Sequence, residues 1–192
     1  MIEKVCVYCS SSSRVDSVYR DAAEKLGRFV AENGYHLVYG GGNLGLMGVL
    51  AQTVKNHGGT ITSVNLELFV RKRINFEGAD ELVVARTMGE RKRIMIDRSD
   101  AFIALPGGFG TLEELSEVLT LKQLHFHTKP IVILNTNRYY DHFLDWIEHS
   151  FSEEFVKEKY REIYHVTDVP EEVITYLQSY SPVELPVKWF EE

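Results

Sequence analysis

The stretch YHLVYGGGNLGLMGVLAQTVKNH, residues 35–57, joins an apolar run, a cluster of glycines and an amphipathic segment. Residues 35–39 predict a buried strand, and the glycines at 40–48 predict a tight turn into a helix. The glycines at 58–59 indicate that this helix ends near residue 57. A strand, a glycine turn and a helix in this order form the repeating unit of a parallel α/β sheet.

The same unit recurs on both sides of this stretch. Further strands are predicted at 4–9, 60–66, 81–85, 101–105 and 130–134, and helices at 18–33, 88–98, 112–124 and 140–150. Shorter helical pieces are expected at 153–160 and 170–180, whereas 67–79 is irregular. This alternation predicts a doubly wound, Rossmann-like α/β fold with a parallel sheet and helices on both faces. We expect residues 1–192 to form a single nucleotide-binding α/β domain.

Charge and composition exclude several classes of function. The net charge of -7 opposes binding to nucleic acid and to anionic membranes. Cys6 and Cys9 form a C-x-x-C pattern, which we interpret as small buried side chains rather than a redox pair or half of a zinc site. The histidines have no metal-ligand spacing, so no metal is expected. The chain enters its first strand without a signal peptide and has no apolar run of membrane-spanning length, which predicts a cytoplasmic protein.

The glycines after the strand at 35–39 are the first candidate ligand-binding segment, because ligands of doubly wound sheets bind outside the carboxyl ends of the strands. The segment GGGNLGLMG, residues 40–48, matches neither the dinucleotide fingerprint nor the P-loop. Its glycines, among them Gly42 and Gly45, let the backbone approach a ligand, and the following helix start favours an anion. A tightly packed turn is the alternative interpretation.

The segment PGGFGTLEE, residues 106–114, is the second candidate. Gly107, Gly108 and Gly110 precede the predicted helix and expose consecutive N–H groups. Thr111 either donates to a phosphate or caps the helix, and with Glu114 it also fits a capping box. Capping does not require three neighbouring glycines, so the pattern favours a ligand-binding loop.

The third candidate is MGERKR, residues 88–93, at the start of another predicted helix. Three consecutive cations there are unfavourable for the helix dipole, so an anionic group is expected nearby. A solvated charged face is the alternative.

The segments GGGNLGLMG, MGERK and SDAFIALPGGFGTLEELSEVLT resemble, in order and spacing, the LOG ("lonely guy") family of cytokinin-activating phosphoribohydrolases. Proteins of this family are often mislabelled lysine decarboxylases. The resemblance runs from about residue 4 to residue 180. It implies hydrolysis of a purine nucleoside 5'-monophosphate, AMP or an N6-modified AMP, to the free base and ribose 5-phosphate. It also implies a homodimer that needs no cofactor.

The resemblance also implies which residues act. Arg91 and Glu114 fall on the family's catalytic positions. The positions that correspond to substrate-binding residues are Gly42, Gly45, Met88, Lys92, Gly107, Gly108, Gly110, Thr111 and Thr120. Gly89 stands where the family usually has histidine, and residues 64–78 lack the usual family pattern, so the preferred base stays open.

Two other functions are alternatives to hydrolysis. A nucleotide-binding carrier or sensor of the same fold would not need a catalytic pair, so the presence of both Arg91 and Glu114 argues against it. A decarboxylase would need a Schiff-base lysine for pyridoxal phosphate, and no segment resembles such a site.

The helix predicted at 112–124 bears on the oligomeric state. Its apolar side chains cover a wide arc and comprise Leu112, Leu115, Val118, Leu119 and Leu124. A second copy of the chain or the C-terminal helices would have to cover this arc. In a dimer with sites near the interface, we expect the basic stretch 71–73 to approach the rim of a site.

Overall fold

The apolar runs predicted as strands form one parallel sheet in the computed structural model, which describes residues 1–185. The sheet has seven strands in the order β4-β3-β2-β1-β5-β6-β7. The strands are β1 (Lys4–Tyr8), β2 (His36–Tyr39), β3 (Ile61–Leu66), β4 (Glu81–Ala85), β5 (Ala101–Ala104), β6 (Ile131–Leu134) and β7 (His165–Thr167). The central strand β1 lies between β2 and β5, and its Val5 is in register with Leu37 of β2 and Ala101 of β5.

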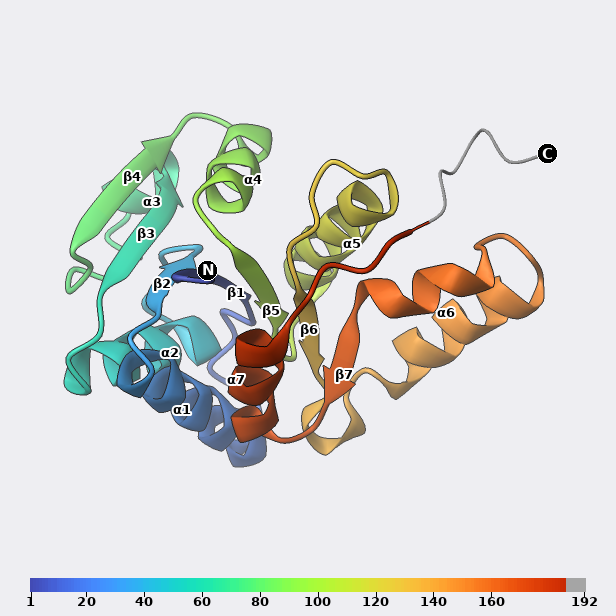
Figure 1. The fold of residues 1–192 in the computed structure, drawn as a ribbon. Helices are drawn as coiled ribbons and strands as arrows, with labels where there is room; N and C mark the ends of the chain where they lie inside the picture. The colour runs from blue at the N-terminus through green and yellow to red at the C-terminus, as the bar shows by residue number, and fades with distance from the viewer. Residues whose placement is uncertain (186–192) are drawn as a thin grey trace.

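Helices cover both faces of this sheet (Figure 1). The long helices are α1 (Ser17–Glu32), α2 (Gly45–Asn56), α4 (Met88–Asp97), α5 (Phe109–Gln123), α6 (Asp141–Ser152) and α7 (Pro170–Ser179). Leu26 of α1, Leu50 of α2 and Val173 of α7 pack on one face. Met95 of α4 and Leu115 of α5 pack on the other. The predicted doubly wound α/β fold is therefore confirmed.

Several boundaries differ from the prediction. Residues 67–79, expected to be irregular, contain the short helix α3 (Glu67–Arg71), and strand β7 was not predicted. The helical piece expected at 153–160 is the 3-10 helix η2 (Glu158–Ile163), and a further 3-10 helix, η1 (Thr136–Arg138), precedes α6. Residues 186–192 of the predicted single domain lie outside the described residues. No helix within residues 1–185 is both long enough and apolar enough to cross a membrane.

The order of the strands determines where a ligand can bind. From β1 the chain builds β2, β3 and β4 outward on one side, then returns to place β5, β6 and β7 on the other. The connections that leave β1 and β5 therefore diverge, and a crevice opens at the carboxyl ends of these two strands. We expect the functional site in this crevice.

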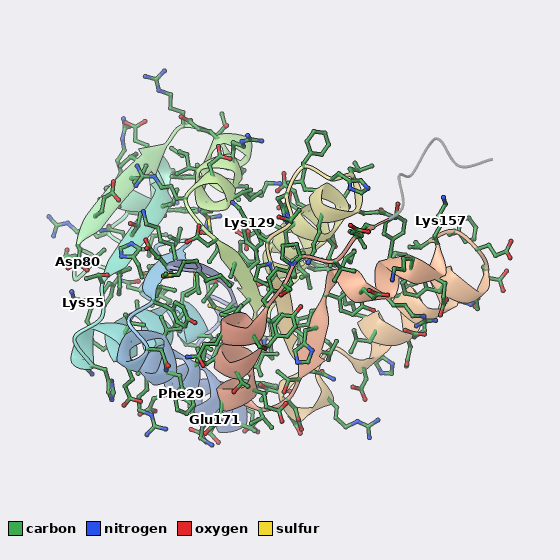
Figure 2. All side chains as sticks on the ribbon, in the orientation of Figure 1. Phe29, Lys55, Asp80, Lys129, Lys157 and Glu171 are labelled. Atoms are coloured by element: carbon green, nitrogen blue, oxygen red, sulfur yellow. The ribbon has the colours of Figure 1, made fainter. Side chains whose placement is uncertain are left out.

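An ion pair lies at the amino end of β3, at the edge of the sheet away from this crevice. Lys55 Nζ of α2 lies 2.9 Å from Asp80 Oδ1, at the edge of the sheet where Figure 2 labels both residues. The other carboxylate oxygen, Oδ2 of Asp80, accepts a hydrogen bond of 2.8 Å from the backbone N–H of Ile61, the first residue of β3. These contacts hold the start of β3 and the turn into β4 against the end of α2.

Candidate active site

The start of α4 is capped by its own side chains. Thr87 precedes the helix, and its hydroxyl accepts a hydrogen bond of 3.1 Å from the backbone N–H of Glu90. The Glu90 carboxylate in turn accepts one of 2.7 Å from the backbone N–H of Arg86. These bonds satisfy N–H groups at the helix start and fix the turn from which Arg91 projects.

Arg91 and Glu114 form a buried ion pair between α4 and α5. Arg91 Nη1 lies 3.0 Å from Glu114 Oε1, and the two residues are 7% and 9% exposed. Arg91 Nε also donates a hydrogen bond of 3.0 Å to the carbonyl of Val64 in β3. A Cβ on Gly40 would lie 1.9 Å from Arg91 Nη2, so only glycine at the end of β2 leaves room for this guanidinium. The backbone thus holds Arg91 on one side and Glu114 on the other.

Burial changes the ionisation of the carboxyl. Removal from water raises the pKa of Glu114, and the adjacent Arg91 guanidinium offsets part of this rise. The result is a carboxyl with a raised pKa that lines a cavity and is held by a permanent cation.

The start of α5 offers unused hydrogen-bond donors. The helix begins at Phe109, three residues before the predicted start, with Gly108 as the capping residue. Thr111 therefore lies inside the first turn and does not cap the helix, and the capping box with Glu114, the alternative interpretation of this segment, is absent. Within residues 1–185, no protein group accepts from the backbone N–H groups of Phe109, Gly110 and Thr111. Such a helix start is suited to bind an anion.

The start of α2 differs from that of α5. The N–H groups of Leu46 and Met47 donate to the carbonyl of Ser10 at 2.9 and 3.3 Å, and that of Gly45 donates to Ser13 Oγ at 3.3 Å. Protein acceptors already occupy these three donors, so the start of α2 is less suited than that of α5 to bind an anion. The glycine turn instead allows close packing: a Cβ on Gly45 would lie 2.4 Å from the backbone of Ser11.

One cavity of about 630 Å³ connects these elements. Its lining includes Arg91 and Glu114 and the predicted binding residues Gly42, Met88, Gly108, Gly110 and Thr111. The lining also contains Gly40 of the candidate segment 40–48 and residues that the sequence did not single out, among them Ser10, Ser11, Ser12, Asn65, Phe69 and Ile74. The cavity lies at the carboxyl ends of β1, β2, β3 and β5, as the strand order requires.

Four predicted binding residues do not line this cavity, and Gly45 is one of them. Lys92 Nζ pairs with Glu113 and, at 3.1 Å, with Glu117, and the bond to Glu113 raises the pKa of Lys92. Thr120 turns its hydroxyl to the carbonyl of Ser116.

The fourth of these residues, Gly107, does not line the cavity but packs against Thr111, which does. A Cβ on Gly107 would lie 2.0 Å from Thr111 Oγ1, so this glycine allows the threonine to pack against the loop. The Gly107 carbonyl accepts a hydrogen bond of 2.6 Å from the Tyr139 hydroxyl. Gly107 therefore shapes the loop without facing the cavity.

Both cysteines are free and buried, as the sequence favours. Burial raises the pKa of Cys6 to about 12 and that of Cys9, which lines the cavity, still further. Neither thiol is a reactive thiolate near neutral pH. Residues 1–185 contain no group of three or more metal-ligating side chains placed to hold an ion.

Comparisons with known proteins add to this geometry. Residues 47–177 match the protein family described as "Possible lysine decarboxylase". The chain is 40% identical to the cytokinin riboside 5'-monophosphate phosphoribohydrolase LOG of Oryza sativa subsp. japonica, over 97% of this chain and 77% of that protein. It is also 40% identical to the phosphoribohydrolase LOG5 of Arabidopsis thaliana, which has the same substrate in its name, over 94% and 79% of the two chains.

The fold recurs in solved structures. The molybdenum cofactor binding protein of Rippkaea orientalis superposes with a TM-score of 0.70 at 22% identity, over 93% of this chain and 97% of that one. The molybdenum cofactor carrier protein of Chlamydomonas reinhardtii gives the same TM-score and identity, over 93% of this chain and 97% of that chain. At this level of identity the likeness establishes the shared fold.

Proposed function

Because the chain belongs to the LOG family of cytokinin riboside 5'-monophosphate phosphoribohydrolases, we propose that it hydrolyses the N-glycosidic bond of a purine nucleoside 5'-monophosphate. The products are the free base and ribose 5-phosphate. The observation that carries the proposal is the buried pair of Arg91 and Glu114 in the same cavity as the unoccupied donors at the start of α5. Release of adenine from AMP by the purified protein, followed by chromatography, tests it directly.

Each part of the cavity has a task in this reaction. The 5'-phosphate binds at the N–H groups of residues 109–111, where the dipole of α5 adds to their attraction. Cleavage of the glycosidic bond builds positive charge on the ribose ring, and the Glu114 carboxylate stabilises that charge and orients the attacking water. Phosphate binding supplies the energy that positions the ribose against Glu114.

The main role of Arg91 in this scheme is to position the Glu114 carboxylate. Two of its nitrogens are engaged by the Glu114 carboxylate and the Val64 carbonyl, so the guanidinium is held in place and favours the charged form of the carboxylate. The Nη2 nitrogen passes over Gly40 in the wall of the cavity, where its charge also offsets negative charge on the departing base.

The cavity does not suit a lysine decarboxylase. That chemistry needs a lysine that forms a Schiff base with pyridoxal phosphate. No lysine is among the residues that line the cavity in the described part of the chain, and Lys92 pairs instead with Glu113 and Glu117. We therefore assign hydrolysis to this site.

The pH dependence of the reaction is expected to follow Glu114. Its carboxyl must be ionised to stabilise the transition state, and its pKa is raised by burial. Activity should therefore fall as the pH drops through a pKa above the ordinary glutamate value of about 4.3. A profile of kcat/KM against pH measures this limb, and a profile that stays flat from pH 7 down to about 4 would contradict the assignment.

We also propose a cytoplasmic location and a homodimer. The two free cysteines support the location, because such thiols persist in reducing compartments. For the dimer, the C-terminal elements cover only part of the apolar arc of α5: Leu119 packs against the buried cluster that contains Ile147 and Phe151. At the other end of the helix, Leu112 is 36% and Phe109 94% exposed. A second copy that covers these two side chains would lie next to the cavity, since Phe109 also lines it.

The basic stretch 71–73 lies near the cavity of its own chain. Phe69 and Ile74, on either side of it, both line the cavity, so it borders the rim without a second copy. The side chain of Arg71 pairs with Glu67 at 2.5 Å.

Light scattering at micromolar concentration is expected to give twice the monomer mass of 22.0 kDa. Leu112→Glu should lower the measured mass to that of the monomer, because it places a charge on the uncovered face of α5. Leu82→Glu is the matched control, since Leu82 is a similarly exposed leucine (42%) on the edge strand β4. A fully active wild-type monomer, or equal effects of both substitutions, would refute this interface.

A further inference from the structure

A buried amide at the end of β3 has no task in the mechanism above. Asn65 is 1% exposed and lines the cavity. Its Nδ2 donates a hydrogen bond of 3.1 Å to the backbone carbonyl of Gly41 in the turn after β2. A carbonyl oxygen can only accept, so this contact fixes which end of the amide faces Gly41.

The other end of the amide is an unused acceptor. Because Nδ2 faces Gly41, Oδ1 is the amide atom without a partner, and no group within residues 1–185 donates to it. Oδ1 is open to the cavity rather than sealed inside the protein. A ligand that displaces water from this oxygen must supply a donor in return, or the hydrogen bond is lost. Asn65 is therefore placed to recognise a hydrogen-bond donor on the substrate.

The sheet indicates which part of the substrate reaches Asn65. The strands run in the order β3-β2-β1-β5, and neighbouring strands lie about 4.8 Å apart, so the end of β3 is roughly 14 Å from the end of β5. The phosphate site is next to β5, and Arg91 crosses Gly40 at the end of β2. A nucleoside monophosphate that spans these strand ends has its phosphate at β5, its ribose near Glu114 and its base toward β3.

The side chains beside Asn65 fit a flat apolar ring. Phe69 and Ile74 lie in the segment that follows β3, and their apolar side chains line the cavity. A purine can pack against such surface and direct its edge to the amide. The base, rather than the phosphate, is thus the group expected beside Asn65.

We propose that Asn65 Oδ1 accepts a hydrogen bond from the exocyclic N–H at C6 of the purine, and that it thereby selects 6-aminopurine over 6-oxopurine nucleotides. An amino group at C6 donates, whereas an oxo group is an acceptor that would face Oδ1 with like polarity. An N6-monoalkyl group keeps one N–H and is accepted by the same contact. This inference rests on the proposed function, because it assigns the base end of that substrate.

The test compares AMP with IMP in the wild type and in Asn65→Leu, which is similar in size and lacks the amide. The ratio of kcat/KM for AMP to that for IMP should fall by about 10- to 100-fold in the variant, mainly through loss of AMP turnover. Differences in leaving-group chemistry are shared by the two proteins and cancel. Ser63→Ala is the matched control: Ser63 lies on the same strand, is buried without a hydrogen-bond partner and does not line the cavity, so the ratio should not change.

Other outcomes overturn the inference. Equal losses for AMP and IMP would place the ribose at Asn65, and an unchanged ratio would remove Asn65 from recognition. If Asn65→Leu does not fold, calorimetry on Glu114→Gln decides, because this variant should bind AMP without hydrolysing it. Purine riboside 5'-monophosphate lacks the amino group and should bind at least about 10-fold more weakly than AMP. Equal affinities would refute the contact. A wild type that releases no base refutes the proposed function, whereas the binding comparison still tests Asn65.

Discussion

Glu114→Gln is expected to lower kcat for adenine release from AMP by at least about 1,000-fold, because it removes the negative charge that stabilises the transition state. Glutamine is close to glutamate in size and keeps an oxygen that can accept from Arg91 Nη1, now 3.0 Å from Glu114 Oε1. The buried guanidinium therefore keeps an acceptor, and the fold should persist. A quenched assay with chromatography of the free base measures the loss.

Glu113→Gln is the matched control for this experiment. It makes the same chemical change one residue earlier on α5, but the Glu113 side chain is 55% exposed and pairs with Lys92 rather than Arg91. Its activity should stay within about threefold of the wild type, because a surface ion pair contributes little. Both variants should show the wild-type circular dichroism spectrum. Normal turnover in Glu114→Gln, or equal losses in the two variants, would end the assignment of Glu114 as the catalytic carboxylate.

The fold could be predicted from local patterns because each strand in the sheet centre is a short apolar run with a clear stop signal. The apolar runs at 4–9 and 101–105 match the buried strands β1 and β5. The predicted start of α5 was three residues too late, because threonine is a common N-cap residue and Thr111 was therefore read as a possible cap. In the structure the Thr111 side chain is buried against Gly107, and the helix extends back to Phe109. Such burial depends on tertiary packing, which a local pattern does not report.

The candidate site was predicted less completely than the fold. Resemblance pointed to Arg91 and Glu114, but their ion pair joins two helices and has no local signal. The glycine turn at 40–48 had the composition of an anion site, yet the Ser10 carbonyl, from a different strand exit, occupies the donors of its helix. Asn65 was missed because it lies inside the strand predicted at 60–66, which already contains other polar residues. A buried polar residue at the carboxyl end of a strand is the signal that could have revealed it.

Removal of the 5'-phosphate is expected to reduce kcat/KM by at least about 1,000-fold, so that adenosine is a very poor substrate compared with AMP. Charge-assisted bonds from the free N–H groups of Phe109, Gly110 and Thr111 contribute most of this difference. The same site predicts the effect of Gly108→Val. A Cβ on Gly108 meets no atom within 4 Å, so the fold tolerates it, but the added methyl groups would enter the cavity where the phosphate binds.

KM for AMP should therefore rise at least about 10-fold in Gly108→Val, because the added side chain competes with the anion for the start of α5. Gly89→Ala is the matched control. A Cβ on Gly89 also meets no atom within 4 Å, but Gly89 lies in α4 and does not line the cavity, so KM should not change. Initial rates with AMP and with adenosine are measured for the wild type, Gly108→Val and Gly89→Ala. Adenosine hydrolysed as efficiently as AMP, or an unchanged KM in Gly108→Val, would show that the start of α5 does not bind the phosphate.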